Sequence, residues 1–275
     1  QYALDFKGKW VAQVRGGPEL TLKSLDKTVT ASAKKTFEMC DYIIADNDLN
    51  YQIIRDMGIP DTKLPFGNIP GTGGIDTKLL GSLNPLPPSQ RVRRIIMPKA
   101  YSGIQSTTLT TLEGIKLAWS RIAPCEIIFT NTTPDNQRWI RTFEDDLLRA
   151  TTIHSQLPRL QLFQLLASSR VMLAPTVLDG VPNVLYESMA TGTVPIVSPL
   201  ETLTPIVNKN EHALFARNLY PNEIADALVL AMNDDSLIDD IAERNRKYIH
   251  QLADRDIIQR QIVDFYAKES FRMLG

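Results

Sequence analysis

The feature that most constrains the fold of this chain is a regular alternation of short apolar runs with amphipathic segments. We predict strands at the apolar runs 10–14, 42–45, 94–97, 126–130, 171–174 and 194–197. Segments with a helical spacing of apolar residues include 108–121, 137–148 and 160–167. Strands joined by crossover helices pair in parallel, so the pattern predicts an α/β protein built from doubly wound, parallel-sheet (Rossmann-like) domains.

The segment 81–90, GSLNPLPPSQ, is the predicted junction between two domains. Its prolines remove backbone donors that a helix or sheet would need. We therefore predict an N-terminal domain at 1–85 and a C-terminal domain at 86–275 that ends in helices. These predicted helices cover 222–232, 237–251 and 256–273. Because the first domain is shorter than the usual ~100 to 150 residues and the chain opens at Gln1, we expect this domain to be incomplete.

Composition argues against several classes of protein. The 30 Lys and Arg residues nearly balance the 31 Asp and Glu residues, so no net field favours nucleic acid or anionic lipid. No apolar run approaches the ~18 to 20 residues of a membrane span. The two cysteines, Cys40 and Cys125, lack metal-binding spacing and are interpreted as buried thiols. We expect a cytoplasmic protein, with a peripheral membrane contact through a region upstream of Gln1 left open.

Hydrolase and metal chemistry also find no support in the sequence. The three histidines are scattered, and no G-x-S-x-G motif accompanies them. Paired aspartates occur only in polar surface stretches without clustered companions. We therefore expect no metal site and no cofactor.

The segment 171–192 is the strongest candidate for a ligand-binding site, because it combines a strand, a loop and a short helix. Pro182 suits the first position of a helix, and Gly192 suits the left-handed residue that ends one. The loop between them is expected at the carboxyl edge of the sheet, where open α/β sheets bind ligands. The N–H groups of Asn183, Val184 and Leu185 are expected to face an anionic oxygen there.

Two carboxylates accompany this predicted helix start. Glu187 lies five residues beyond Pro182, about 7.5 Å along the axis, and helical side chains lean back toward the N-terminus. Its carboxylate suits the two neighbouring hydroxyls of a ribose. Asp179, in the loop, is placed to accept hydrogen bonds from a second polyol, such as a donor sugar. The alternative for both is an ordinary solvated carboxylate.

These residues carry a family resemblance. The sequence at 179–198, DGVPNVLYESMATGTVPIVS, resembles the signature of family 4 retaining glycosyltransferases of the GT-B fold. That signature is an acidic residue, seven others and Glu, followed by Ala-x-Gly-x-Pro, two hydrophobic residues and Ser. Weaker similarities extend the resemblance over roughly positions 40 to 250, from the end of an N-terminal domain through the C-terminal domain.

The resemblance implies how a UDP- or GDP-linked sugar donor is held. It implies that Glu187 binds the ribose and that Asp179 contacts the donor sugar. The sugar and diphosphate lie along the loop and helix start formed by Gly180, Val181, Pro182, Asn183 and Val184. It also implies metal-independent transfer of a hexosyl or other glycosyl group, with retention, to a glycan or lipid-linked acceptor. The departing diphosphate then helps to deprotonate the acceptor, in polysaccharide or glycoconjugate assembly.

The chain departs from the family pattern at two places. The family has an Arg and, five positions on, a Lys that grip the diphosphate, whereas this chain has Lys99 and Ile104. We predict that Lys99 acts with Asp179 in catalysis, by neutralising charge on the leaving diphosphate. The second departure is Glu201-Thr202, where the family usually has a pair of glycines.

The predicted first strand is followed by Arg15, Gly16 and Gly17, which we expect to line the cleft from the N-terminal side and meet the donor. A plain glycine turn is the alternative.

Two further hypotheses stay open for the whole chain. One is a catalytically weak, glycosyltransferase-like binding subunit, motivated by Ile104. The other is a sugar-nucleotide epimerase of the same fold.

Overall fold

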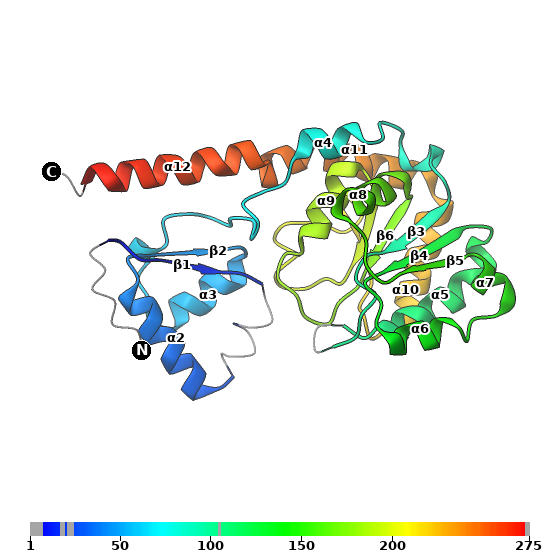
Figure 1. The fold of residues 1–275 in the computed structure, drawn as a ribbon, viewed down its shortest axis with the longest axis horizontal. Coiled ribbons are helices and arrows are strands. Elements are labelled where there is room, and N and C mark those ends of the chain that lie inside the picture. Colours follow the sequence, from blue (N-terminus) through cyan, green and yellow to red (C-terminus); the bar gives the residue numbers. More distant parts are fainter. Residues whose placement is uncertain (1–7, 17–19, 21–24, 104–105, 273–275) are drawn as a thin grey trace.

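The computed structural model describes residues 8–16, 20, 25–103 and 106–272 and divides them between two α/β domains (Figure 1). The small domain holds a parallel pair of strands, β1 (Val11–Val14) and β2 (Tyr42–Ala45). Its helical elements are α2 (Lys27–Met39), α3 (Asp48–Asp56) and the short 3-10 helix η1 (Asp61–Lys63). Phe37, Ile43 and Ile54 are buried between these elements, which gives the small domain a core of its own.

The large domain is built on a six-stranded parallel sheet. Its strands are β3 (Arg94–Met97), β4 (Glu126–Thr130), β5 (Thr151–His154), β6 (Val171–Ala174), β7 (Val194–Val197) and β8 (Leu214–Phe215). Their spatial order is β5-β4-β3-β6-β7-β8, with Arg94 opposite Glu126 and Ile95 opposite Val171. The order reverses between β3 and β6, and ligands of doubly wound sheets bind at that point, beyond the carboxyl ends of the strands.

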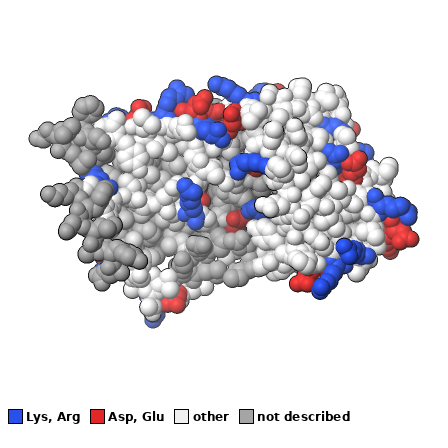
Figure 2. Space-filling view, viewed as in Figure 1, with Lys and Arg blue, Asp and Glu red and all other residues white. Residues whose placement is uncertain are grey.

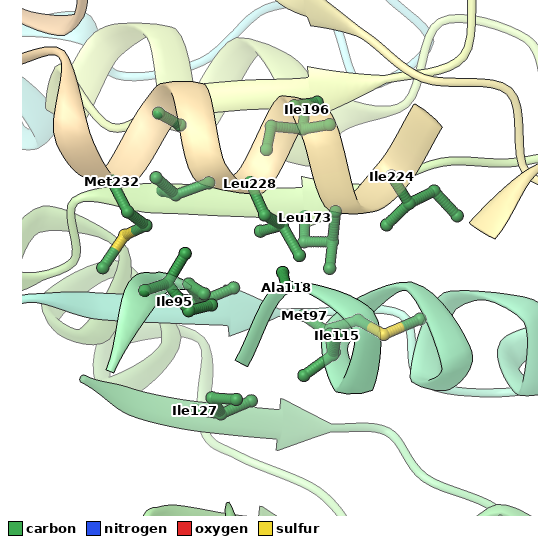
Figure 3. Close-up of a cluster of buried hydrophobic side chains, with 14 of the residues drawn as sticks. Ile95, Met97, Ile115, Ala118, Ile127, Leu173, Ile196, Ile224, Leu228 and Met232 are labelled. Atoms are coloured by element: carbon green, nitrogen blue, oxygen red, sulfur yellow. The ribbon is translucent and has the colours of Figure 1, made fainter. Parts of the chain in front are cut away.

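Alternation along β3 sends side chains to two helical layers. Ile95 and Met97 face α5 (Thr108–Ile122) and α10 (Pro221–Asn233), as Figure 3 shows. Ile96 faces the other layer, which contains α8 (Arg159–Ser168) and α9 (Asn183–Thr191). The remaining large-domain elements are α4 (Thr77–Ser82), η2 (Pro88–Gln90), α6 (Pro134–Ile140), α7 (Asp145–Arg149) and α11 (Asp235–Ala253). Both faces of the sheet are therefore covered, as the continuous apolar strands require.

The contact between α5 and α10 depends on Gly114. A Cβ atom at this position would lie 2.6 Å from Ile224 Cγ2 and 3.0 Å from the carbonyl oxygen of Pro221. We expect Gly114→Ala to lower the free energy of unfolding, because overpacking costs about 1 to 3 kcal/mol and the gain in helix propensity returns only about 1 kcal/mol. Urea denaturation would measure the difference.

Gly81 in α4 is the matched control for that substitution. A Cβ atom there would meet its nearest neighbour, the carbonyl oxygen of Ala190, at an ordinary 3.8 Å. Gly81→Ala should therefore stabilise the protein by about 0.5 to 1 kcal/mol through helix propensity alone. Equal effects of the two substitutions would contradict the close contact between α5 and α10.

The parallel α/β fold is confirmed, and its strands largely match the predicted ones. Five of the six predicted strands have the expected bounds, and the first begins one residue later, at Val11. The strands β5 and β8 were not predicted. The single helix expected at 137–148 is wrong, because α6 ends at Ile140 and α7 begins at Asp145. Phe143 occupies the break and turns into the core beside Phe129, with ring centroids 6.5 Å apart.

The two domains are joined by two crossings of the chain that lie side by side. The N–H of Ile75 donates to the carbonyl of Ala253 at 2.8 Å, and the N–H of Arg255 donates to the carbonyl of Ile75 at 2.9 Å. Gly74 has a φ of +91° here, and a Cβ atom on it would lie 2.8 Å from the Ala253 carbonyl oxygen. The paired crossings therefore require glycine at this position.

The packing divides the chain differently from the boundary expected at 85. Leu80 of α4 is buried in the large-domain core. After the second crossing, α12 (Arg255–Arg272) returns to the small domain, as Figure 1 shows. There Ile258 packs against Ile44, and Phe265 lies edge-on to Tyr42 with centroids 4.9 Å apart. The apolar residues of α12 thus cover the small domain rather than the large sheet.

In the part of the chain described above, no helix is long and apolar enough to cross a membrane.

Candidate functional site

A cleft of about 370 Å³ lies between the two domains, at the point where the strand order reverses. The small domain contributes Arg15, Gly16, Asp46, Gly71 and Thr72 to its lining. The large domain contributes Pro98, Lys99, Asn131, Arg159, Leu162, Asp179, Gly180, Val181, Pro182, Asn183, Val184 and Glu187. A cleft of this size, lined by convergent polar groups, suits a small-molecule ligand.

The structure brings together in this cleft most of the residues that the sequence predicts to bind the donor or act in catalysis; Leu185 is not in the lining, and Gly17 lies outside the described residues. Lys99 follows β3 and Asp179 follows β6, and the carboxyl ends of these two neighbouring strands meet at the cleft. Thr72 of the small domain also reaches across and donates to Asn183 Oδ1 at 3.1 Å. Both walls are thus in direct contact at the start of α9.

The start of α9 presents free backbone donors to the cleft. The helix begins at Asn183, so Pro182 is its N-cap residue rather than its first helical residue. Gly192 ends it in the left-handed conformation, with φ of 73°, as expected. Among the described residues, the N–H groups of Asn183 and Val184 have no hydrogen-bond acceptor, whereas Leu185 donates to the Pro182 carbonyl at 2.9 Å. Two donors, not the expected three, therefore remain for an anion.

Asp179 is held from both sides. Its Oδ2 accepts a hydrogen bond from Lys99 Nζ at 2.9 Å, and its Oδ1 accepts one from the N–H of Gly180 at 2.9 Å. Thr202 donates through its hydroxyl to the Asp179 carbonyl at 2.9 Å. The threonine that stands in place of a glycine therefore anchors the loop that carries Asp179.

Glu187 is a buried carboxylate at the floor of the cleft, with a side chain only 5% exposed. Its Oε1 accepts a hydrogen bond from Arg159 Nη2 at 2.6 Å. Burial raises the pKa of Glu187 above its usual value, and the positive charges of Arg159 and Lys99 oppose the rise. A buried carboxylate whose hydrogen bonds a ligand can take over suits the recognition of hydroxyl groups.

Arg159 is a site residue that the sequence analysis missed. It is the first residue of α8 and follows β5, which was not predicted. Recognising 151–154 as a parallel strand would have placed the loop after it at the same edge of the sheet as Asp179.

The small-domain wall is organised by Asp46, which was also missed. Its carboxylate accepts hydrogen bonds from the N–H of Gly16 at 2.8 Å, from Asn47 Nδ2 at 2.7 Å and from Asn50 Nδ2 at 3.1 Å. Burial raises the pKa of Asp46, while these hydrogen bonds oppose the rise. Asp46 thus fixes the turn at Gly16, which has a φ of 75°, and places it against the cleft beside Arg15.

Gly17 and Ile104 lie outside the described residues. Cys40 and Cys125 are buried and unpaired. In the described ranges, no group of three His, Cys, Asp or Glu side chains is placed to hold a metal ion. Figure 2 shows positive and negative side chains interspersed over the visible described surface, in keeping with the balanced composition.

Comparison with known proteins agrees with this architecture. The family model described as "Glycosyl transferases group 1" matches residues 112–234. The chain is similar to HepE (Alr3699) from Anabaena, solved in complex with UDP, at a TM-score of 0.70 and 13% identity over 94% of this chain and 72% of that one. The chain has the GT-B fold.

Other GT-B structures match equally well. Sucrose-phosphate synthase from Thermosynechococcus elongatus has a TM-score of 0.72 and 18% identity, over 98% of this chain and 69% of that one. A glycosyltransferase from Rickettsia africae has a TM-score of 0.67 and 13% identity, over 96% and 71%. No curated protein matches the chain. The family-model match includes Arg159, Asp179 and Glu187 but stops short of Lys99 and the whole small-domain wall.

Proposed function

We propose that this chain is a glycosyltransferase that holds a nucleotide-sugar donor in the cleft and transfers the sugar to an acceptor hydroxyl. The observation that carries the proposal is the large-domain wall. There the free N–H groups of α9, the ammonium of Lys99 and the carboxylates of Asp179 and Glu187 line one cleft. The similarity to HepE, which has been solved with UDP and with UDP-glucose, supports the proposal.

Each part of the donor has a chemically suitable partner in this arrangement. The diphosphate suits the N–H groups of Asn183 and Val184, because a helix N-terminus attracts anions. The ribose diol suits Glu187, which lies one turn further along α9. The sugar hydroxyls suit Asp179, whose loop adjoins the helix start. The donor therefore runs along the wall from Glu187 to Asp179.

For the transfer step we propose the course that the family resemblance implies. The bond between the anomeric carbon and the phosphate oxygen breaks, and its electron pair goes to that oxygen. The acceptor oxygen bonds to the same face of the anomeric carbon and passes its proton to the departing diphosphate, so configuration is retained. Lys99 stabilises the charge that develops on the phosphate. Since the positive charge comes from the protein, this proposal requires no metal ion.

The broader role extends the same proposal. The acceptor is a glycan or lipid-linked hydroxyl met from the small-domain side, in cytoplasmic polysaccharide or glycoconjugate assembly. One observation favours a second candidate function, a weakly catalytic binding subunit. Ile104 is uncharged, whereas the family that this chain resembles usually has a second cation at the corresponding position.

Turnover of a panel of UDP- and GDP-sugars, followed by NMR of the anomeric signals, tests this function. We expect release of nucleoside diphosphate only when an acceptor is present, a product with the donor's anomeric configuration, and no change in rate with excess chelator. Binding without release would favour the subunit. Conversion of free donor without acceptor would indicate an epimerase, and failure to bind any of these nucleotides would contradict the proposal.

A further inference from the structure

The charge of Arg159 lies at the electrostatically unfavourable end of its own helix, although its guanidinium also lies over the ring of Phe163, 5.2 Å from the centroid. Arg159 is the first residue of α8, where the unpaired N–H groups of the helix disfavour a positive charge. Its side chain is 61% exposed although its partner, Glu187, is almost completely buried. An exposed cation at the unfavourable end of a helix, directed into a cleft, points to a role with a ligand.

The cleft pairs its large-domain cations and carboxylates one to one. Lys99 contacts Asp179 at 2.9 Å, and Arg159 contacts Glu187 at 2.6 Å. A nucleotide sugar can take the place of the cation beside each carboxylate and of the carboxylate beside each cation. Its hydroxyls donate to the two carboxylates, and its diphosphate attracts the two cations that those carboxylates held. The two ion pairs therefore balance the charge of the large-domain wall, and each holds a cation that an anionic ligand can attract.

The contact between Arg159 and Glu187 determines which of the two phosphates of the donor Arg159 can reach. A ribose held by Glu187 through its 2′ and 3′ hydroxyls carries its phosphate on the 5′ carbon, which is attached to C4′ on the same ring, so a guanidinium that contacts Glu187 can reach that phosphate. Of the Arg159 nitrogens, only Nη2 donates a hydrogen bond within the described part of the chain. The remaining N–H groups form a planar fork that matches two oxygens of a phosphate.

We propose that Arg159 is the second diphosphate-binding cation of the donor site. On donor binding it yields Glu187 to the ribose and binds the phosphate nearest the ribose, opposite Lys99. It supplies the charge that Ile104 does not provide. This inference rests on the proposed function, since it needs a nucleoside diphosphate in the cleft.

Titration of the whole chain with UDP and with uridine, followed by ligand-observed NMR, separates the phosphate from the ribose. We expect R159Q to weaken UDP binding about 10- to 100-fold and uridine binding about threefold or less, because the lost hydrogen bonds involve charged groups. R159K should recover part of the UDP affinity as a point charge. Arg138→Gln is the matched control, since its side chain is 79% exposed on α6, away from the lining residues.

Equal losses for UDP and uridine would overturn the proposal, because Arg159 would then act only by orienting Glu187. Unchanged UDP affinity in R159Q would overturn it as well. A wild-type chain that binds neither UDP nor GDP would instead contradict the proposed function. Thermal melting of each variant shows whether a loss of affinity comes from a damaged fold, and the exposure of Arg159 predicts that it does not.

Discussion

Replacing Glu187 with glutamine should nearly abolish nucleotide binding without lowering the stability of the fold at neutral pH. The amide keeps the size of the side chain but removes the negative charge and replaces one acceptor oxygen with a donor, so the ribose hydroxyls lose their charged, two-oxygen acceptor. Because each hydrogen bond to a charged group contributes about 1.5 to 3 kcal/mol, we expect affinity to fall by about 100-fold or more.

The free energy of unfolding should increase in Glu187→Gln at neutral pH, although nucleotide affinity falls. Burial raises the pKa of Glu187, so the folded protein holds this proton more tightly than the unfolded chain does. The stability of the wild type therefore falls as pH rises from the usual glutamate value of 4.5 through the raised value. The penalty is present in full above that window, and Glu187→Gln removes it. Arg159 loses its partner, but it is largely exposed and solvent screens its charge.

Calorimetric titration with nucleoside diphosphate and urea denaturation at several pH values would measure both effects. Glu243→Gln is the control, because that carboxylate is 69% exposed and, among the described residues, forms an ion pair only with Lys247 on its own helix. It should not alter binding. Because the hydrogen bond from Lys247 lowers the pKa of Glu243, any change that this variant makes in the pH dependence of unfolding should have the opposite sign to that of Glu187→Gln. A Glu187→Gln variant that binds normally would remove Glu187 from the donor site, whereas one that fails to fold would mean that its carboxylate is structural.

Replacing Lys99 with methionine should lower turnover far more than donor affinity. The ammonium helps most when negative charge develops on the leaving phosphate, and loss of such a preorganised group costs about 10²- to 10³-fold in kcat. Asp179 keeps its hydrogen bond from Gly180, so the loop should stay in place. Arginine at this position should restore part of the rate, because it keeps the charge in a different geometry.

Steady-state kinetics with the preferred donor would measure kcat and KM for each variant. Lys116→Met on α5 is the control, since within the described residues the exposed Lys116 pairs only with the half-buried Glu113. A Lys99→Met enzyme with unchanged kcat would show that the α9 amides and Arg159 suffice to stabilise the leaving group.

Most of the large sheet could be predicted because its central strands are buried on both faces and read as continuous apolar runs. The strands β5, with the sequence TTIH, and β8, with only two residues, carry no such signal. The return of α12 to the small domain was also not predictable. Its apolar residues show that the helix packs, but not against which domain, and that choice depends on contacts distant in the sequence.

In the site, as in the fold, residues with a local sequence signal could be predicted and residues that depend on distant contacts could not. Asp179, Glu187 and Lys99 could be predicted because they adjoin strand ends or carry a recognisable motif. Arg159 belongs to no motif, and Asp46 ends one of the weaker family similarities without an assigned role; each matters through a partner 28 to 30 residues away in the chain. Only the folded arrangement shows that one pairs with Glu187 and that the other holds the Gly16 turn.

A crystal structure of the chain with UDP or GDP would test the central claim most directly. We predict the ribose hydroxyls within hydrogen-bonding distance of Glu187, the diphosphate against the N–H groups of Asn183 and Val184, and Lys99 turned from Asp179 toward the phosphate. A nucleotide bound outside the interdomain cleft, or bound in it with Glu187 still paired to Arg159 and apart from the ribose, would contradict this account.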